Sequence, residues 1–209
     1  MHTADLLALF QAPPGDLRAL DCNFRHDGYL YATSGHVAVR IEDDPSVDAS
    51  SDGAGRWAAK IEALLTRYAP ADTEFVALEI EPPADECHEC AGTGLVRATA
   101  VCGDCSGDGV VGFEVGRHDY TVECAECKGS GMVPADEMGE CPACVGGGKI
   151  YSGDRVLIGR LWFSSRYALR LRRLPAAEFA LAAGAPGGPL VFRGVGGGRR
   201  YVGLVAPLA

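Results

Sequence analysis

CHECAGTG at residues 87–94 is the first of four copies of one motif, followed by CGDCSGDG at 102–109, CAECKGSG at 124–131 and CPACVGGG at 141–148. Each copy, termed a knuckle, follows the pattern C-x-x-C-x-G-x-G. Two residues between the cysteines let one turn of chain present two sulfurs to one ion, and zinc takes four such ligands in a tetrahedron. The glycines supply the positive φ angles that so tight a turn needs. Four knuckles therefore predict two zinc ions per chain.

The remaining features of the chain decide between metal and disulfides. Eight of the nine cysteines lie between residues 87 and 144, and Cys22, which stands apart, is expected to be a small buried apolar residue. The first residues have no basic leader and only a short apolar run, so a secretory signal is not expected there. No apolar run nears the roughly 18–20 residues of a membrane span. The chain is therefore expected in the cytoplasm, where paired cysteines indicate metal, and a disulfide-linked loop region is the alternative.

In motif and spacing, residues 85–149 resemble the cysteine-rich zinc-binding domain of DnaJ-type chaperones. That resemblance implies an elongated β-hairpin structure in which the first knuckle pairs with the fourth and the second with the third. It implies two sites, each with four sulfurs. Site one would contain Cys87, Cys90, Cys141 and Cys144, and site two would contain Cys102, Cys105, Cys124 and Cys127. His88, inside the first knuckle, is an alternative ligand.

The sequence between the second and third knuckles independently supports this pairing. Residues 110–115 and 118–122 have the alternating pattern of two strands joined by a Gly116-Arg117 turn. None of the five histidines precedes Pro-Asp, so the chain lacks the His-Pro-Asp of a J domain. The resemblance therefore implies that the chain binds unfolded polypeptide, but it does not imply that the chain stimulates an ATPase partner.

The flanking segments predict an α+β domain formed by residues 1–84 and 150–209, with the zinc module of residues 85–149 inserted in it. Hydrophobic periodicity predicts two similar β/α units, so the domain is expected to be a duplication. The predicted helices cover residues 4–11, 56–68 and 164–174. The predicted strands cover residues 17–24, 29–34, 36–42, 74–80, 155–163, 178–182, 189–195 and 200–205.

The duplicated unit resembles one domain of a DNA sliding clamp. The resemblance is carried by YATSGHVAVR at residues 31–40, FSSRYALRL at 163–171 and YVGLVAPL at 201–208. In clamps, helices offer basic side chains to DNA phosphates. The corresponding candidates for nucleic-acid contact in this chain are Arg166, Arg170, Arg172 and Arg173, and a solvated basic helix face is the alternative.

Charge is unevenly distributed along the chain. Residues 85–149 contain 12 acidic and 4 basic side chains, whereas residues 150–209 contain 2 acidic and 9 basic ones, within a chain of net charge −9. So acidic a zinc module repels nucleic acid, and proteins are its expected partners.

No nucleophile–base pair or phosphate-binding loop is present, and four-sulfur zinc sites leave no open position for a substrate. We therefore expect a non-enzymatic adaptor. The alternatives are a clamp-like protein that associates with DNA through its basic C-terminal half, and a chaperone-like protein that binds unfolded polypeptide. A membrane partner is not expected, and the oligomeric state stays open.

Overall fold

The computed structural model describes all residues except 13–19, 51–53, 72–73, 78–79, 183–186 and 209. Contacts between Cα atoms divide the chain into two compact units. Unit 1 combines Met1–Pro83 with Tyr151–Ala209, and unit 2 is Ala84–Ile150. No helix among the described residues has both the length and the apolar character that a membrane span requires.

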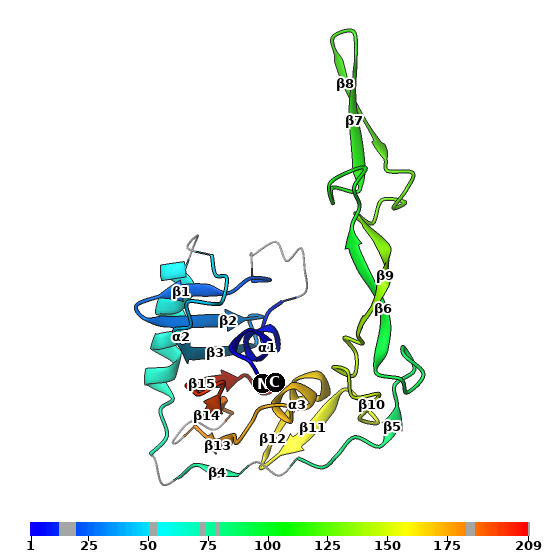
Figure 1. The fold of residues 1–209 in the computed structure, drawn as a ribbon. Helices are drawn as coiled ribbons and strands as arrows, with labels where there is room; N and C mark the ends of the chain where they lie inside the picture. The colour runs from blue at the N-terminus through cyan, green and yellow to red at the C-terminus, as the bar shows by residue number, and fades with distance from the viewer. Residues whose placement is uncertain (13–19, 51–53, 72–73, 78–79, 183–186, 209) are drawn as a thin grey trace. The chain divides into compact units, whose positions relative to one another are not determined.

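Unit 1 is built on one seven-stranded antiparallel sheet (Figure 1). The strand order is β1-β2-β3-β15-β14-β13-β4, and every neighbouring pair is antiparallel. The strands are β1 (Phe24–His26), β2 (Tyr29–Thr33), β3 (Val37–Glu42), β4 (Val76–Ala77), β13 (Glu178–Leu181), β14 (Leu190–Gly196) and β15 (Arg199–Val205). Because β3 pairs with β15, strands from the two ends of the chain form a continuous sheet.

Side chains alternate across this sheet and form an apolar layer on each face. On one face, Phe192 is fully buried, stacks on Phe10 at a centroid distance of 5.4 Å, and contacts Phe179 and Tyr201. Phe10 follows the short helix α1 (Thr3–Ala8). On the other face, helix α2 (Ala54–Arg67) buries Ala58, Ile61 and Leu65 in a cluster with sheet residues that include Tyr31, Ala38 and Leu204.

Residues 155–164 form a hairpin that lies outside the large sheet. Strand β11 (Arg155–Ile158) pairs with β12 (Leu161–Ser164), and helix α3 (Ser165–Leu171) follows at once. The prediction of a single strand over 155–163 is wrong because Gly159, at φ +62°, reverses the chain in the middle. The apolar alternation continues on the far side of the turn, so periodicity does not reveal the break.

The predicted α+β fold with two clamp-like β/α units is also wrong. Among the described residues, fifteen strands stand against three helices of 6, 14 and 7 residues, so the chain is mostly β. The strands assigned to two units instead join in one antiparallel sheet, and the hairpin β11–β12 has no counterpart among the described residues of the first half of the chain. The predicted strand over 17–24 falls partly outside the described residues. Of its described residues, 20–24, only Phe24 belongs to a strand, as the first residue of β1.

Unit 2 is a series of nested two-stranded ladders. From the outermost pair inward, β5 (Asp85–Glu86) pairs with β10 (Lys149–Ile150), β6 (Leu95–Val101) with β9 (Met132–Glu140), and β7 (Val110–Val115) with β8 (His118–Glu123). The knuckles occupy the intervals between successive ladders. The chain therefore leaves and rejoins unit 1 at one end of the series and reverses direction at the β7–β8 turn at the other.

Candidate metal centres

The eight cysteines of the knuckles form two groups of four. In each group the sulfur atoms all lie within 4.8 Å of one another. The first and fourth knuckles contribute one group, and the second and third contribute the other. The members are Cys87, Cys90, Cys141 and Cys144 in site one, and Cys102, Cys105, Cys124 and Cys127 in site two.

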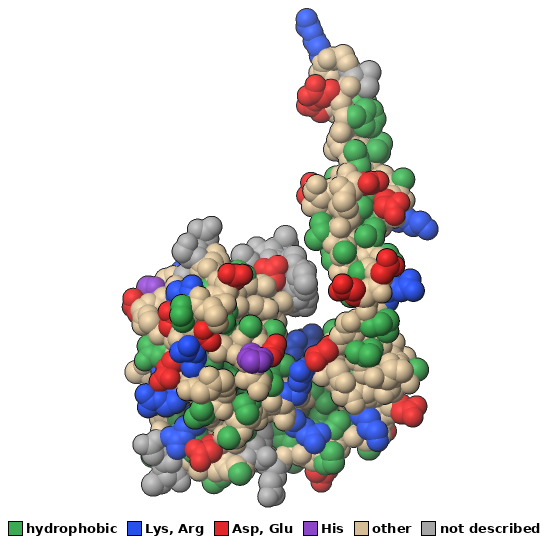
Figure 2. Space-filling view, in the orientation of Figure 1, with side chains coloured by type: hydrophobic (Ala, Val, Ile, Leu, Met, Phe, Trp, Pro, Cys, Tyr) green, Lys and Arg blue, Asp and Glu red, His purple; other side chains and the backbone are tan. Residues whose placement is uncertain are grey.

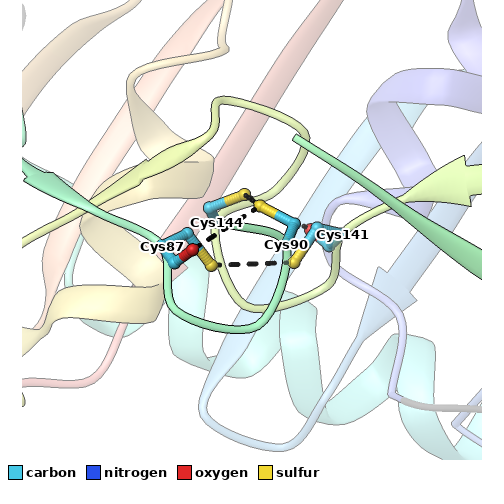
Figure 3. A group of neighbouring side chains, drawn as sticks. All are labelled: Cys87, Cys90, Cys141 and Cys144. Carbon is cyan, nitrogen blue, oxygen red and sulfur yellow. Dashed lines mark hydrogen bonds between the residues drawn. The ribbon is translucent and has the colours of Figure 1, made fainter. Parts of the chain in front are cut away.

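The spacing of the sulfurs fits a tetrahedral zinc ion. In site one, shown in Figure 3, the four sulfurs converge, with 3.8 Å from Cys87 Sγ to Cys141 Sγ and 3.8 Å from Cys90 Sγ to Cys144 Sγ. The corresponding distances in site two are 3.8 Å and 3.7 Å. A tetrahedron with Zn–S bonds of about 2.3 Å has edges of about 3.8 Å. All eight cysteines are free thiols rather than disulfides, and each group can hold one zinc ion.

Each knuckle orients its second sulfur with a backbone hydrogen bond. The N–H of Gly94 donates to Cys90 Sγ at 3.2 Å, and the last glycine of every other knuckle makes the equivalent bond at 3.2 to 3.3 Å. Such bonds stabilise the thiolate form and fix the direction of the sulfur. The last glycine of the motif therefore has a direct part in the site.

The glycines also let paired knuckles pack against each other. A Cβ atom on Gly94 would overlap the carbonyl oxygen of Gly146, and one on Gly148 would overlap that of Gly92. Site two repeats the arrangement between Gly109 and Gly129 and between Gly131 and Gly107. The last glycine of each motif is therefore required for its missing side chain. The first glycine contributes the carbonyl that fills that space, and its own φ of +74° to +94° favours glycine.

A second reciprocal contact joins the paired knuckles. The N–H of Cys87 donates to the carbonyl oxygen of Gly148 at 3.0 Å, and the N–H of Cys141 donates to that of Gly94 at 2.8 Å. In site two, Cys102 and Cys124 make the same bonds to Gly131 and Gly109 at 2.9 Å each. The backbone thus brings the two halves of each site together with approximate two-fold symmetry.

Thiols this close together cannot all ionise without a cation. Burial raises the pKa of Cys144 to about 12. Burial also acts on Cys90, but the N–H of Gly94 and the neighbouring thiols outweigh it and lower the pKa to about 7. One thiolate in site one is thus favoured while another is disfavoured. Since zinc binds thiolates, its positive charge is what allows four of them in one site.

The residue between the second cysteine and the first glycine has a role that sequence reasoning missed. These four residues all adopt left-handed backbone conformations, with φ of +47°, +53°, +51° and +52° for Ala91, Ser106, Lys128 and Val145. Each begins the turn that carries the chain around the sulfurs. In the pattern C-x-x-C-x-G-x-G this position can hold any residue, and the four knuckles have four different residues there, so the sequence gives no sign of its conformation except the glycine that follows.

The other predicted site residues are placed differently. His88 is exposed and is not in either group. Of the four arginines proposed to contact nucleic acid, Arg166 and Arg170 lie in α3, whereas Arg172 is its C-cap and Arg173 follows it. Arg166 and Arg172 are exposed, and the other two are half-buried.

No protein-family model, curated protein or solved structure matches this chain. The two metal centres therefore rest on the geometry of their own residues.

Proposed function

We propose that unit 2 is a DnaJ-type zinc module that binds other proteins, and that the chain acts as a non-enzymatic adaptor. The four knuckles and their nested grouping support the DnaJ-type assignment. Four sulfurs complete the coordination of each ion, so neither site keeps the open position that a catalytic zinc needs. The role proposed for the metal is to hold the ladders of unit 2 in place.

The observation that carries this proposal is an exposed apolar face on the β7–β8 hairpin. Val111 pairs with Val122, and Phe113 pairs with Tyr120, so these four side chains share one face of the ladder. Their exposed fractions are 37%, 49%, 45% and 47%, and the rings of Phe113 and Tyr120 stack at 5.6 Å. Figure 2 shows exposed hydrophobic side chains along this part of unit 2.

The β7–β8 hairpin needs a source of stability other than its own apolar side chains. An isolated two-stranded ladder is marginally stable in water, and apolar side chains that stay exposed to solvent contribute little to its stability. Site two joins the ends of both strands, because Cys102 and Cys105 precede β7 and Cys124 and Cys127 follow β8. The zinc site thus stabilises a surface that would otherwise have to bury itself, and exposed apolar patches of this type serve binding.

Charge defines the kind of partner. The other face of the hairpin bears Glu114, Asp119 and Glu123, and residues 85–149 have a net charge of −8 before any metal is counted. Each zinc ion with four thiolates adds a further formal charge of −2. Polypeptide segments that combine apolar and basic side chains complement such a surface.

Peptide binding tests the proposal directly. Full-length, zinc-loaded protein is applied to an array of 13-residue peptides in which apolar content and net charge vary independently. We expect retention on peptides that contain both aromatic or branched apolar residues and arginine or lysine. The double substitution Phe113→Ser and Tyr120→Ser should abolish retention. The control Val110→Ser and Met138→Ser changes two similarly exposed apolar residues, one on the other face of the hairpin and one in β9, and should not. Equal binding by both variants would contradict the proposal.

Chaperone-like binding of unfolded polypeptide would use the same apolar face. Protection of a denaturing client from aggregation distinguishes it from adaptor function, because an adaptor binds one defined segment and leaves the bulk of an unfolded chain free. Suppression of aggregation at equimolar protein, lost in the Phe113 and Tyr120 variant, would favour the chaperone-like alternative.

A further inference from the structure

The segment 155–173 contains six arginines and no acidic residue. Elsewhere in the C-terminal half of unit 1, arginines are paired with carboxylates. Arg193 lies 2.9 Å from Glu178, Arg199 lies 3.2 Å from Asp44, and Arg200 lies 2.8 Å from Glu42.

Within the described part of the chain, Arg155, Arg160, Arg166 and Arg170 have no carboxylate at ion-pair distance. In a chain of net charge −9, so local an excess of positive charge needs an explanation.

The hairpin β11–β12 presents these charges beside exposed apolar side chains. Its inner face includes Phe163, which is fully buried, and its outer face contains the cross-strand pair Leu157 and Trp162, which are 52% and 43% exposed. The guanidinium of Arg155 lies 4.8 Å from the centre of the Trp162 ring. Arginine and an exposed indole are thus in contact on the same face of the hairpin.

Two more arginines lie close to this pair. Arg155 is the cross-strand partner of Ser164, the N-cap of α3, so Arg166 lies near the same end of the hairpin. Arg160 occupies the β11–β12 turn at the opposite end. The two end pairs, Arg155–Ser164 and Ile158–Leu161, are three residues apart along the strand, a span of about 10 Å at the usual rise. Together these residues define an arginine surface: Arg155, Leu157, Arg160, Trp162 and Arg166.

We propose that the arginine surface binds single-stranded nucleic acid, with guanidinium groups on phosphates and the Trp162 indole stacked on a base. Arginine matches the geometry of phosphate oxygens, and no carboxylate of the described residues pairs with the arginines of this surface. An aromatic ring beside the cations suits an unpaired base, which a duplex does not expose.

The half-buried Arg170 adds to the attraction for an anion. Burial, followed by the charge of Arg166, lowers the pKa of Arg170, and both guanidinium groups contact the ring of Tyr167. A phosphate bound near Arg166 would relieve the repulsion between the two arginines. Among the described residues no carboxylate lies at ion-pair distance from either arginine, so an external anion is the group that fits.

Fluorescence anisotropy with full-length, zinc-loaded protein and a labelled 20-nucleotide dT strand tests this proposal. Binding should weaken steeply between 50 and 200 mM salt. The substitutions Arg155→Glu and Arg166→Glu should weaken it at least tenfold and, for two lost phosphate contacts, lower the slope of log affinity against log salt by about 1.4. The control Arg56→Glu and Arg67→Glu makes the same change of charge at two exposed arginines of α2 and should stay within twofold of the unchanged protein.

A third variant separates base stacking from charge. Trp162→Leu should weaken binding about tenfold while leaving the salt slope unchanged, because stacking does not release counterions. A 20-nucleotide rU strand should bind like dT, and a duplex of the same length should bind more weakly than either strand. Thermal melts followed by circular dichroism establish that each variant is folded, and Arg155→Gln with Arg166→Gln replaces the reversal if it is not.

Three results would overturn the proposal. The first is no binding of dT at 50 mM salt. The second is equal affinity of the Arg155 and Arg166 variant and its α2 control. The third is tighter binding of polyglutamate than of the nucleic acid, which would assign the surface to an acidic protein.

Discussion

The two units of this protein obtain their stability from different sources. Unit 1 buries aromatic and branched side chains on both faces of a seven-stranded sheet. In unit 2, by contrast, the buried clusters described consist of the eight cysteine side chains, with a few partly buried apolar residues against them. The three ladders of unit 2 are largely exposed. The comparison shows that metal–sulfur bonds can take the place of an apolar core, and that a chain can then leave apolar side chains exposed for other uses.

Removal of zinc should produce the largest difference between the units. Structural zinc contributes on the order of 10 kcal/mol or more per site, and unit 2 has little else to replace it. We expect a strong chelator to unfold residues 84–150 while unit 1 stays folded. Limited proteolysis after chelation should cut within unit 2 first. Both tryptophans, Trp57 and Trp162, lie in unit 1, so their fluorescence should hardly change. A unit 2 that resists protease without metal would contradict this account.

Sequence patterns predict some of this structure and fail for the rest, for physical reasons. The knuckles and the hairpin at residues 110–123 are local features, since spacing and turn residues determine them within a few positions. Strands β2 and β3 and helix α2 also appear close to the predicted bounds. In each case the information lies within the segment that folds.

The duplicated β/α fold was predicted wrongly because strand pairing is not local. Each half of the chain contains strands and a helix, and nothing within either half indicates that β3 pairs with β15 across more than 150 residues. The knuckle contacts between Gly94 and Gly146 or between Gly109 and Gly129 are likewise long-range. The motif predicts glycines at these positions, but only the structure gives their partners.

A substitution in the apolar core of unit 1 should destabilise that unit and leave the zinc sites of unit 2 intact, the opposite of what chelation should do. Phe192 is fully buried among Phe10, Phe179 and Tyr201, so Phe192→Ala should destabilise unit 1 by about 3–5 kcal/mol through lost burial and a cavity. Tryptophan fluorescence during urea unfolding measures this loss. Zinc release, followed with a colorimetric chelator, should occur as in the unchanged protein, and a parallel loss of zinc would mean that the units are not energetically independent.

A methyl group at a knuckle glycine should disturb one zinc site. In Gly109→Ala, the new Cβ meets the carbonyl of Gly129, and φ of +74° is unfavourable for alanine. Crowding and the left-handed conformation together should cost about 3 kcal/mol. Gly116 is the matched control, since its φ is +69° but no atom lies within 4 Å of a Cβ there. Gly116→Ala should cost only about 1 kcal/mol. Competition with a chelator of known affinity measures both, and similar losses would show that packing between knuckles contributes little.

The smallest expected effect is a gain in stability at Val145. A β-branched side chain at φ +52° is strained, whereas asparagine tolerates the left-handed region. Val145→Asn should therefore stabilise site one by about 1 kcal/mol, seen as slower zinc loss to a chelator. Ala91→Asn, at φ +47° in the partner knuckle, should give a smaller gain because alanine is not β-branched. If neither change helps, the metal has already overcome the backbone strain of the turn. The stability of unit 2 would then depend on its sulfur ligands and hardly at all on the conformational preferences that support a fold such as unit 1.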